Sequence, residues 1–148
     1  MAESNLFVTG GEENISFEVP LAERMRPRTL DEYAGQRHIL APGKALRSML
    51  DGGKAPSCIL YGPPGVGKTT LVRLIARVTG RVLLEINAVS AKVETLRDLV
   101  ERARGEKKLS ARSAIAFVDE IYHFNSKQQN VLLPAVETGD LILIGTTT

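Results

Sequence analysis

The stretch GPPGVGKTT, residues 62–70, constrains the fold more than any other part of this sequence. It fits the pattern G-x-x-x-x-G-K-[ST] from Gly62 to Thr69. The apolar run SCILYG precedes it, and apolar residues at the i, i+3, i+4, i+7 spacing of one helix face follow it. A glycine-rich turn between a strand and a helix aims its backbone N–H groups at one point, where they form an anion site. The pattern therefore predicts a strand, a phosphate-binding loop and a helix.

The rest of the sequence continues this alternation of strands and helices. Short apolar runs predict strands, and apolar residues at helical spacing predict helices. The predicted strands cover 57–62, 81–87, 114–119 and 141–148, and the predicted helices cover 46–51, 69–79, 93–103 and 126–138. Ser126 and Gln129 have capping-box spacing, and Pro134 should bend the last helix or confine its regular part to one side. Such alternation predicts an α/β fold, a parallel sheet with helices on both faces.

Composition narrows the class of protein. At 148 residues the chain has the length of one domain, and we expect a flexible arm over 1–19 and a nucleotide-binding core over 20–148. The formal charge of +2 is too small to indicate nucleic-acid binding by itself. One cysteine and two histidines exclude an internal disulfide and a structural zinc site. No apolar run is long enough for a membrane helix, so we expect a cytoplasmic protein without a membrane partner.

Two adjacent acids, Asp119 and Glu120, follow the strand predicted at 114–119. Neighbouring carboxylates repel each other, and a divalent cation offsets that repulsion. Lys68 is expected to reach the β- and γ-phosphates of a nucleotide, and the Thr69 hydroxyl and Asp119 to hold Mg²⁺. Glu120 would then orient or deprotonate the attacking water, so it is the candidate catalytic base. The simpler alternative is a solvated pair of acids at a strand end.

The residues expected to surround the phosphates lie in and directly after the loop. They are Gly62, Pro63, Pro64, Gly65, Val66, Gly67, Lys68, Thr69 and Thr70.

The phosphate-binding loop and the acid pair together resemble those of an AAA+ ATPase of the clamp-loader and branch-migration branch. Over residues 20–148 the sequence is most similar to the replication-associated recombination protein A family, which includes the eukaryotic Werner-helicase-interacting ATPases. The stretches that carry the resemblance are PLAERMRPRTLDEYAGQRHILAPGKALR, ILYGPPGVGKTTLVRLIA, FVDEIYHFNSKQQNVLLPAVETG and LIGTTT. They match the family's entry segment, Walker A region, Walker B region with its helix, and sensor 1 strand.

The resemblance to this family implies properties that the residues by themselves do not indicate. It implies ATP as the nucleotide, a ring-type homo-oligomer for the full-length protein, and DNA and replication-fork proteins as partners. It implies that the segment 33–40 lies over the adenine with Ile39 in contact. It also implies that Thr147 or Thr148 is the sensor of the attacking water or γ-phosphate, with Thr148 our choice.

Two differences from the family pattern limit these expectations. Tyr122-His123 replaces the His-Arg that usually follows Asp-Glu-Ile, so a histidine replaces a permanent charge. The family also continues past the position of Thr148 into an arginine finger, a fifth strand, sensor 2 and a helical lid. In the family strand order 5-1-4-3-2, the strand at 57–62 would then be an edge that invites association. We therefore expect this sequence alone to bind ATP better than it hydrolyses it, with weak or no turnover.

Several alternatives stay open. A P-loop GTPase would be expected to carry Asn-Lys-x-Asp, which does not occur in the sequence. A P-loop kinase would need a second substrate pocket and would have little use for Glu120. A nucleotide-binding interaction module without turnover is harder to exclude, as is another motor such as a branch-migration or clamp-loader ATPase.

Overall fold

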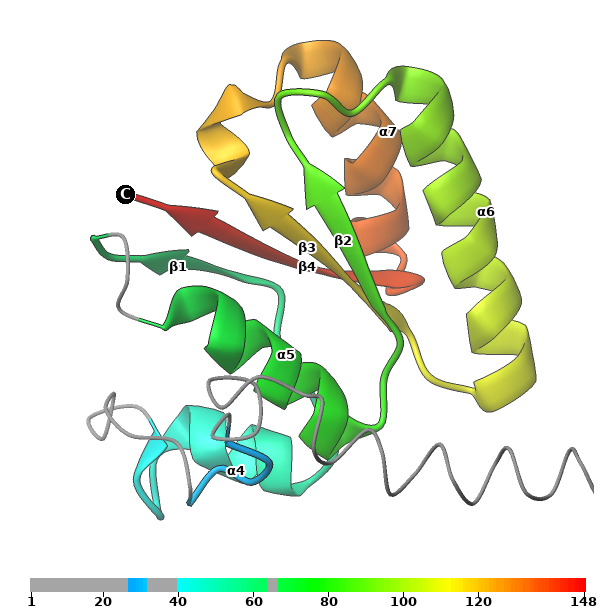
Figure 1. The fold of residues 1–148 in the computed structure, drawn as a ribbon. Helices are drawn as coiled ribbons and strands as arrows, with labels where there is room; N and C mark the ends of the chain where they lie inside the picture. The colour runs from blue at the N-terminus through cyan, green and yellow to red at the C-terminus, as the bar shows by residue number, and fades with distance from the viewer. Residues whose placement is uncertain (1–26, 32–39, 64–66) are drawn as a thin grey trace, which may run out of the picture.

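The structure, a computed structural model, describes residues 27–31, 40–63 and 67–148. Strands and helices alternate along this part of the chain (Figure 1). The elements are α4 (Ala45–Asp51), β1 (Cys58–Tyr61), α5 (Lys68–Thr79), β2 (Leu83–Asn87), α6 (Val93–Ser110), β3 (Ala114–Asp119), the 3₁₀ turn η1 (Ile121–His123), α7 (Ser126–Glu137) and β4 (Leu141–Thr147). The arm expected over 1–19 lies outside the described residues.

The four strands form one parallel sheet in the order β1-β4-β3-β2. β4 lies in the middle, with Tyr61 of β1 in register with Thr147 and with Val118 of β3 in register with Gly145. The parallel α/β sheet and its order are therefore confirmed. Because all strands run the same way, their carboxyl ends share one edge, which is where such sheets bind ligands.

Helices cover both faces of the sheet (Figure 1). α4 and α5 pack on one face, in a core that includes Leu50, Val72, Ile75 and Ile144. α6 and α7 pack on the other, in a core that includes Leu96, Ala103, Val118 and Leu132. The interior strand β3 is buried from Ala114 to Val118, which explains its unbroken apolar sequence. Burying each large side chain of these cores contributes about 1.5–3 kcal/mol.

The helix α7 differs from its prediction in two respects, the residues that cap it and the effect of Pro134. Its capping box consists of Asn125 and Gln128, one residue before the predicted pair Ser126 and Gln129. The expectation that Pro134 confines the regular part of the helix is wrong, because α7 continues to Glu137. Thr138 closes the helix by donating its backbone N–H to the carbonyl of Pro134 at 3.1 Å.

β1 is an edge strand of the described sheet, and one of its faces is open. Cys58 and Leu60 are half-buried on the α5 side, whereas the side chains of Ile59 and Tyr61 are 59% and 81% exposed. A hollow of about 310 Å³ lies beside Ile59; its other lining residues are Ile121, Phe124, Gln129, Leu132, Leu133 and Leu143. Open apolar edges favour pairing with another chain, so self-association of this chain stays a prediction that a monodisperse monomer at high concentration would contradict.

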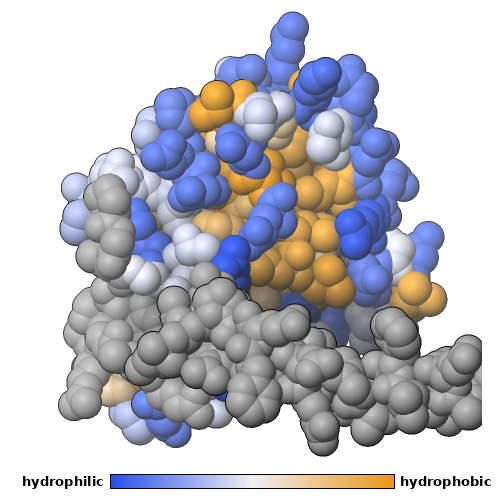
Figure 2. All heavy atoms as spheres, viewed as in Figure 1, coloured by the Kyte–Doolittle hydropathy of each residue, from blue (hydrophilic) through white to orange (hydrophobic). Residues whose placement is uncertain are grey.

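The opposite edge of the sheet is β2. Figure 2 shows that apolar residues gather in the middle of the face over β2, with hydrophilic residues around them. Leu84 and Ile86 are nonetheless only 7% and 8% exposed, because α6 packs over them.

No helix of the described residues is long and apolar enough to span a membrane.

Candidate nucleotide site

The described part of the phosphate-binding loop joins the carboxyl end of β1 to the first turn of α5. Gly67 has φ 84°, a left-handed conformation that glycine adopts without a steric penalty, and α5 begins at the next residue. Gly62 is buried and donates its backbone N–H to the carbonyl of Thr147 at 3.2 Å. The loop is therefore anchored to the end of β4, with the N-terminus of a twelve-residue helix at its far side.

Lys68 reaches back across this loop. Its ammonium nitrogen Nζ donates to the backbone carbonyls of Gly62, at 2.5 Å, and Thr147, at 2.9 Å. Both acceptors are neutral, so a phosphate oxygen would be a stronger partner for the charge. Lys68 thus marks a point between the loop and the end of β4 where an anion would be held.

The end of β4 also contacts the two acids. Thr146 donates its hydroxyl hydrogen to Oδ1 of Asp119, and the backbone N–H of Glu120 donates to the same hydroxyl oxygen at 3.3 Å. The Thr146 side chain is only 1% exposed, so this contact is part of the sheet interior. Contacts therefore run from Lys68 through Thr147 and Thr146 to Asp119, and the loop and the acids share one edge of the sheet.

Glu120 has a backbone conformation that is uncommon for its residue type. Its φ is 53°, in the left-handed region, and it is the N-cap of η1. Its carboxylate oxygen Oε2 lies 3.5 Å from Nε2 of His123, and both side chains are nearly half-exposed. Ile121 packs tightly against Gly145, since a Cβ added to Gly145 would lie 2.7 Å from Ile121 Cδ1. η1 therefore packs directly against β4.

The structure places the other predicted site residues as follows. Thr69 and Thr70 lie half-buried in the first turn of α5, and Pro63 is exposed directly after Gly62. Thr147 ends β4 and Thr148 follows it, exposed. Pro64, Gly65, Val66 and Ile39 lie outside the described residues.

Sequence reasoning missed Thr146. Side chains alternate along a strand, so Thr146 shares a face of β4 with Ile144, and Asp119 shares a face of β3 with Phe117. Ile144 and Phe117 both belong to the core under α5. That alternation was the available signal that Thr146, rather than Thr147, faces Asp119.

The donor set suits Mg²⁺ better than a metal held by protein alone. No group of three or more His, Cys, Asp or Glu side chains that could hold a metal occurs among the described residues. Mg²⁺ usually binds one or two carboxylates and keeps waters and phosphate oxygens as its other ligands. Thr146 contacts one oxygen of Asp119, which leaves the second oxygen available. Asp119 and the Thr69 hydroxyl therefore fit a magnesium ion that arrives with a nucleotide.

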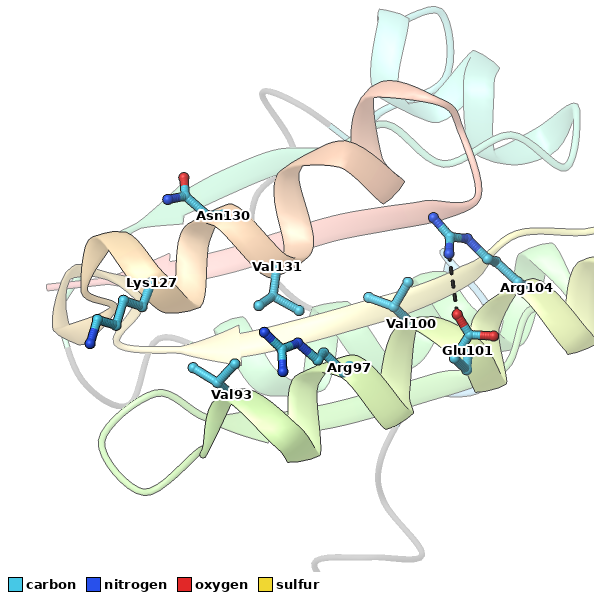
Figure 3. A pocket seen from close by; sticks show the side chains of 8 residues that line it. All are labelled: Val93, Arg97, Val100, Glu101, Arg104, Lys127, Asn130 and Val131. Carbon is cyan, nitrogen blue, oxygen red and sulfur yellow. Dashed lines mark hydrogen bonds and ion pairs between the residues drawn. The ribbon is translucent and has the colours of Figure 1, made fainter.

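A second hollow lies between α6 and α7 (Figure 3). It is an open groove of about 670 Å³. Its lining residues are Val93, Arg97, Val100, Glu101, Arg104, Lys127, Asn130 and Val131. Arg104 contacts Glu101 and Asp140. Neither Arg97 nor Lys127 forms an ion pair with another residue in the described part of the chain.

Comparisons with known proteins agree with this geometry. The family model of the AAA ATPases, "ATPase family associated with various cellular activities", matches residues 58–148. The replication-associated recombination protein A of Escherichia coli K12 is 46% identical over 129 residues, which are 87% of this chain and 29% of that protein. The protein of the same name from Coxiella burnetii is 48% identical over 130 residues, 88% of this chain and 29% of that protein.

A solved structure matches as well. The Holliday junction branch migration motor RuvB of Thermotoga maritima is 29% identical with a TM-score of 0.66, over 84% of this chain and 42% of that one. The chain spans about 29% of the length of the two curated relatives named above. It belongs to the AAA family of ATPases, in the branch of the replication-associated recombination protein A.

Proposed function

We propose that this chain binds ATP with Mg²⁺ at the carboxyl edge of its sheet, and that Glu120 is the base for hydrolysis. The observation that carries the proposal is the run of contacts from Lys68 through Thr147 and Thr146 to Asp119. A phosphate-binding lysine and a magnesium-binding carboxylate are both needed for one nucleotide, and both lie around the end of β4.

Each residue then has a separate role. The backbone N–H groups of the loop and the N-terminus of α5 bind phosphate oxygens, and Lys68 exchanges its two carbonyl partners for the β- and γ-phosphates. Asp119 and Thr69 hold Mg²⁺, which when bound neutralises charge on the phosphates. Glu120 accepts a proton from the attacking water. From the family resemblance we also propose that Ile39 contacts the adenine and that Thr147 or Thr148 senses the γ-phosphate.

We propose a ring-type homo-oligomer as the working assembly, on the basis of family membership. In that assembly an arginine from outside this site would stabilise the transferring phosphate, an effect of about 10³ to 10⁵ in rate in related systems. Binding by this chain should therefore be stronger than its turnover. The open face of β1 is a candidate contact surface for such an assembly, because Ile59 and Tyr61 are exposed there.

We also propose association with DNA, and the groove between α6 and α7 supports it. Arg97 and Lys127 come from different helices, and neither forms an ion pair with a described acid. Lys127 lies in the first turn of α7, whose partial positive charge adds to the attraction for phosphates. The names of the E. coli and T. maritima proteins refer to recombination and to branch migration, which are processes on DNA.

The hydrolysis proposal is tested with Glu120→Gln, which keeps the shape of the side chain and removes the base. ATP affinity should stay within about twofold of wild type, while single-turnover release of phosphate by the full-length protein should fall by about 10²- to 10⁴-fold. Glu137→Gln, an exposed change at the end of α7, is the matched control. Normal phosphate release by Glu120→Gln would exclude Glu120 as the base, and ATP binding without any wild-type turnover would favour a binding module.

A further inference from the structure

Glu120 has a partner of its own that the proposed hydrolysis does not use. His123 Nε2 lies 3.5 Å from the carboxylate oxygen Oε2 of Glu120, one 3₁₀ turn further along the chain. We infer that His123 is a positioning residue that holds Glu120 in a resting orientation and so slows hydrolysis. This inference rests on the proposed role of Glu120 as the base.

The backbone fixes the distance between the two side chains. The His123 N–H donates to the carbonyl of Glu120 at 3.0 Å, and the Phe124 N–H donates to that of Ile121 at 3.0 Å. The Glu120 N–H is held by the Thr146 hydroxyl. With these bonds in place the main chain of η1 cannot carry Glu120 away from His123. Only rotation of the two side chains can separate them.

The ring of Tyr122 also contacts the ring of His123. The two ring centroids lie 4.3 Å apart, with an angle of 38° between the ring planes. Tyr122 is 57% exposed, so this contact between tilted rings lies at the surface. The imidazole therefore contacts both Tyr122 and Glu120.

The contact between Glu120 and His123 opposes the movement that Glu120 must make to act as a base. A base must come within hydrogen-bond reach of the water it deprotonates, and a carboxylate that lies against another polar side chain has first to turn away from it. Exposed pairs of this kind have small interaction energies. Removal of His123 should therefore change the hydrolysis rate by between about 1.4-fold and fivefold, the factor that corresponds to such energies.

Substitution of His123 tests the inference through rate and affinity together. His123→Ala should raise the single-turnover hydrolysis rate by up to about fivefold, with ATP affinity unchanged. His123→Gln, which keeps a polar side chain at this position, should raise it less. In a Glu120→Gln background the same substitution should have no effect. An unchanged or slower rate for His123→Ala would overturn the inference, as would an equal acceleration in the Glu120→Gln background.

A second readout needs no nucleotide. The chain has two histidines, His38 and His123, so ring nitrogen signals in NMR spectra can be assigned with His123→Gln alone. Glu120→Gln should shift the Nε2 signal of His123, and the control Glu137→Gln should leave it in place. An unmoved signal would refute the contact. Failure of the wild type to bind ATP would instead refute the proposed function, because the NMR result does not depend on binding.

Discussion

Thr146 in β4 donates its hydroxyl hydrogen to Asp119 at the end of β3, and so joins the two central strands at the edge where the loop lies. The same hydroxyl accepts the backbone N–H of Glu120 at 3.3 Å. One buried side chain therefore positions both acids. Because β4 also contacts Lys68 through Thr147, this strand end connects the phosphate side of the site with its magnesium side.

Replacing Thr146 with Val should weaken the site while leaving the packing almost intact. The two side chains have nearly the same shape, but Val leaves the Glu120 N–H and one Asp119 oxygen without their partner. We expect a loss of about 0.5–1.5 kcal/mol in unfolding free energy for each hydrogen bond, measured by urea unfolding. Mg²⁺-dependent ATP affinity should fall as well. Thr146→Ser keeps the hydroxyl and should behave like wild type; equal loss in both variants would contradict this role.

Gly145→Ala should disturb η1 and through it Glu120. The added Cβ would lie 2.7 Å from Cδ1 and 3.1 Å from Cβ of Ile121, so η1 has to shift. Overpacking of this kind costs about 1–3 kcal/mol, and hydrolysis should fall more than ATP affinity. The partner variant is Ile121→Ala, which removes the obstructing atoms. If Gly145→Ala lowers hydrolysis as much in the Ile121→Ala background as in wild type, the contact between Gly145 and Ile121 does not position Glu120.

Asp140 should make stability depend on pH. Hydrogen bonds from Thr138 and Lys107 lower the pKa of Asp140, and Arg104 contributes to the same effect. A carboxyl with a lowered pKa in the folded state stabilises the fold above its unfolded pKa of about 4, and this contribution is lost as the pH falls through the folded pKa.

Asp140→Asn should therefore destabilise the chain at pH 7 and much less at about pH 3, in urea unfolding at both pH values. Asp98→Asn, on the exposed face of α6, is the control. A destabilisation that is the same at both pH values would show that the charge of Asp140 is not involved.

The groove between α6 and α7 gives a prediction about salt. If Arg97 and Lys127 each neutralise one DNA phosphate, replacing both with Gln should weaken binding to duplex DNA. The slope of log affinity against log salt should become less negative by about 1.8, since each phosphate contact contributes about 0.9. ATP affinity should be unaffected. The matched control replaces Arg73 and Arg77, on the outer face of α5, with Gln. An equal change in the salt dependence of DNA binding there would show that the groove is not the DNA-binding surface.

Much of this fold could be predicted because its elements have regular patterns. β3 is apolar throughout because both of its faces are buried, and α5 shows helical spacing because one side packs on the sheet. The position of the α7 cap could not be predicted from pattern alone. Asn125 and Ser126 are both good caps, and each is followed by Gln three residues later. Tertiary contacts decide, because the Gln128 amide also donates to the carbonyls of Ala88 and Ala91.

The candidate site was predictable to a similar degree. The loop and the acid pair are sequence patterns, and their meeting follows from parallel strands with a shared edge. The roles of Thr146 and His123 depend on side-chain direction. Alternation along β4 could have indicated that Thr146 faces Asp119. Nothing in the sequence, by contrast, signals the left-handed conformation of Glu120 or its contact with His123.

Titration calorimetry of ATP, with Mg²⁺ and with EDTA, tests the central claim most directly, in wild type, Lys68→Ala and Asp119→Asn. If the loop and the acids form one site, wild type should bind ATP more tightly with Mg²⁺, and Asp119→Asn should lose that gain while keeping its affinity in EDTA. Lys68→Ala should lose at least tenfold under both conditions. Full Mg²⁺ dependence in Asp119→Asn, or undiminished binding by Lys68→Ala, would contradict a single magnesium–nucleotide site at this edge of the sheet.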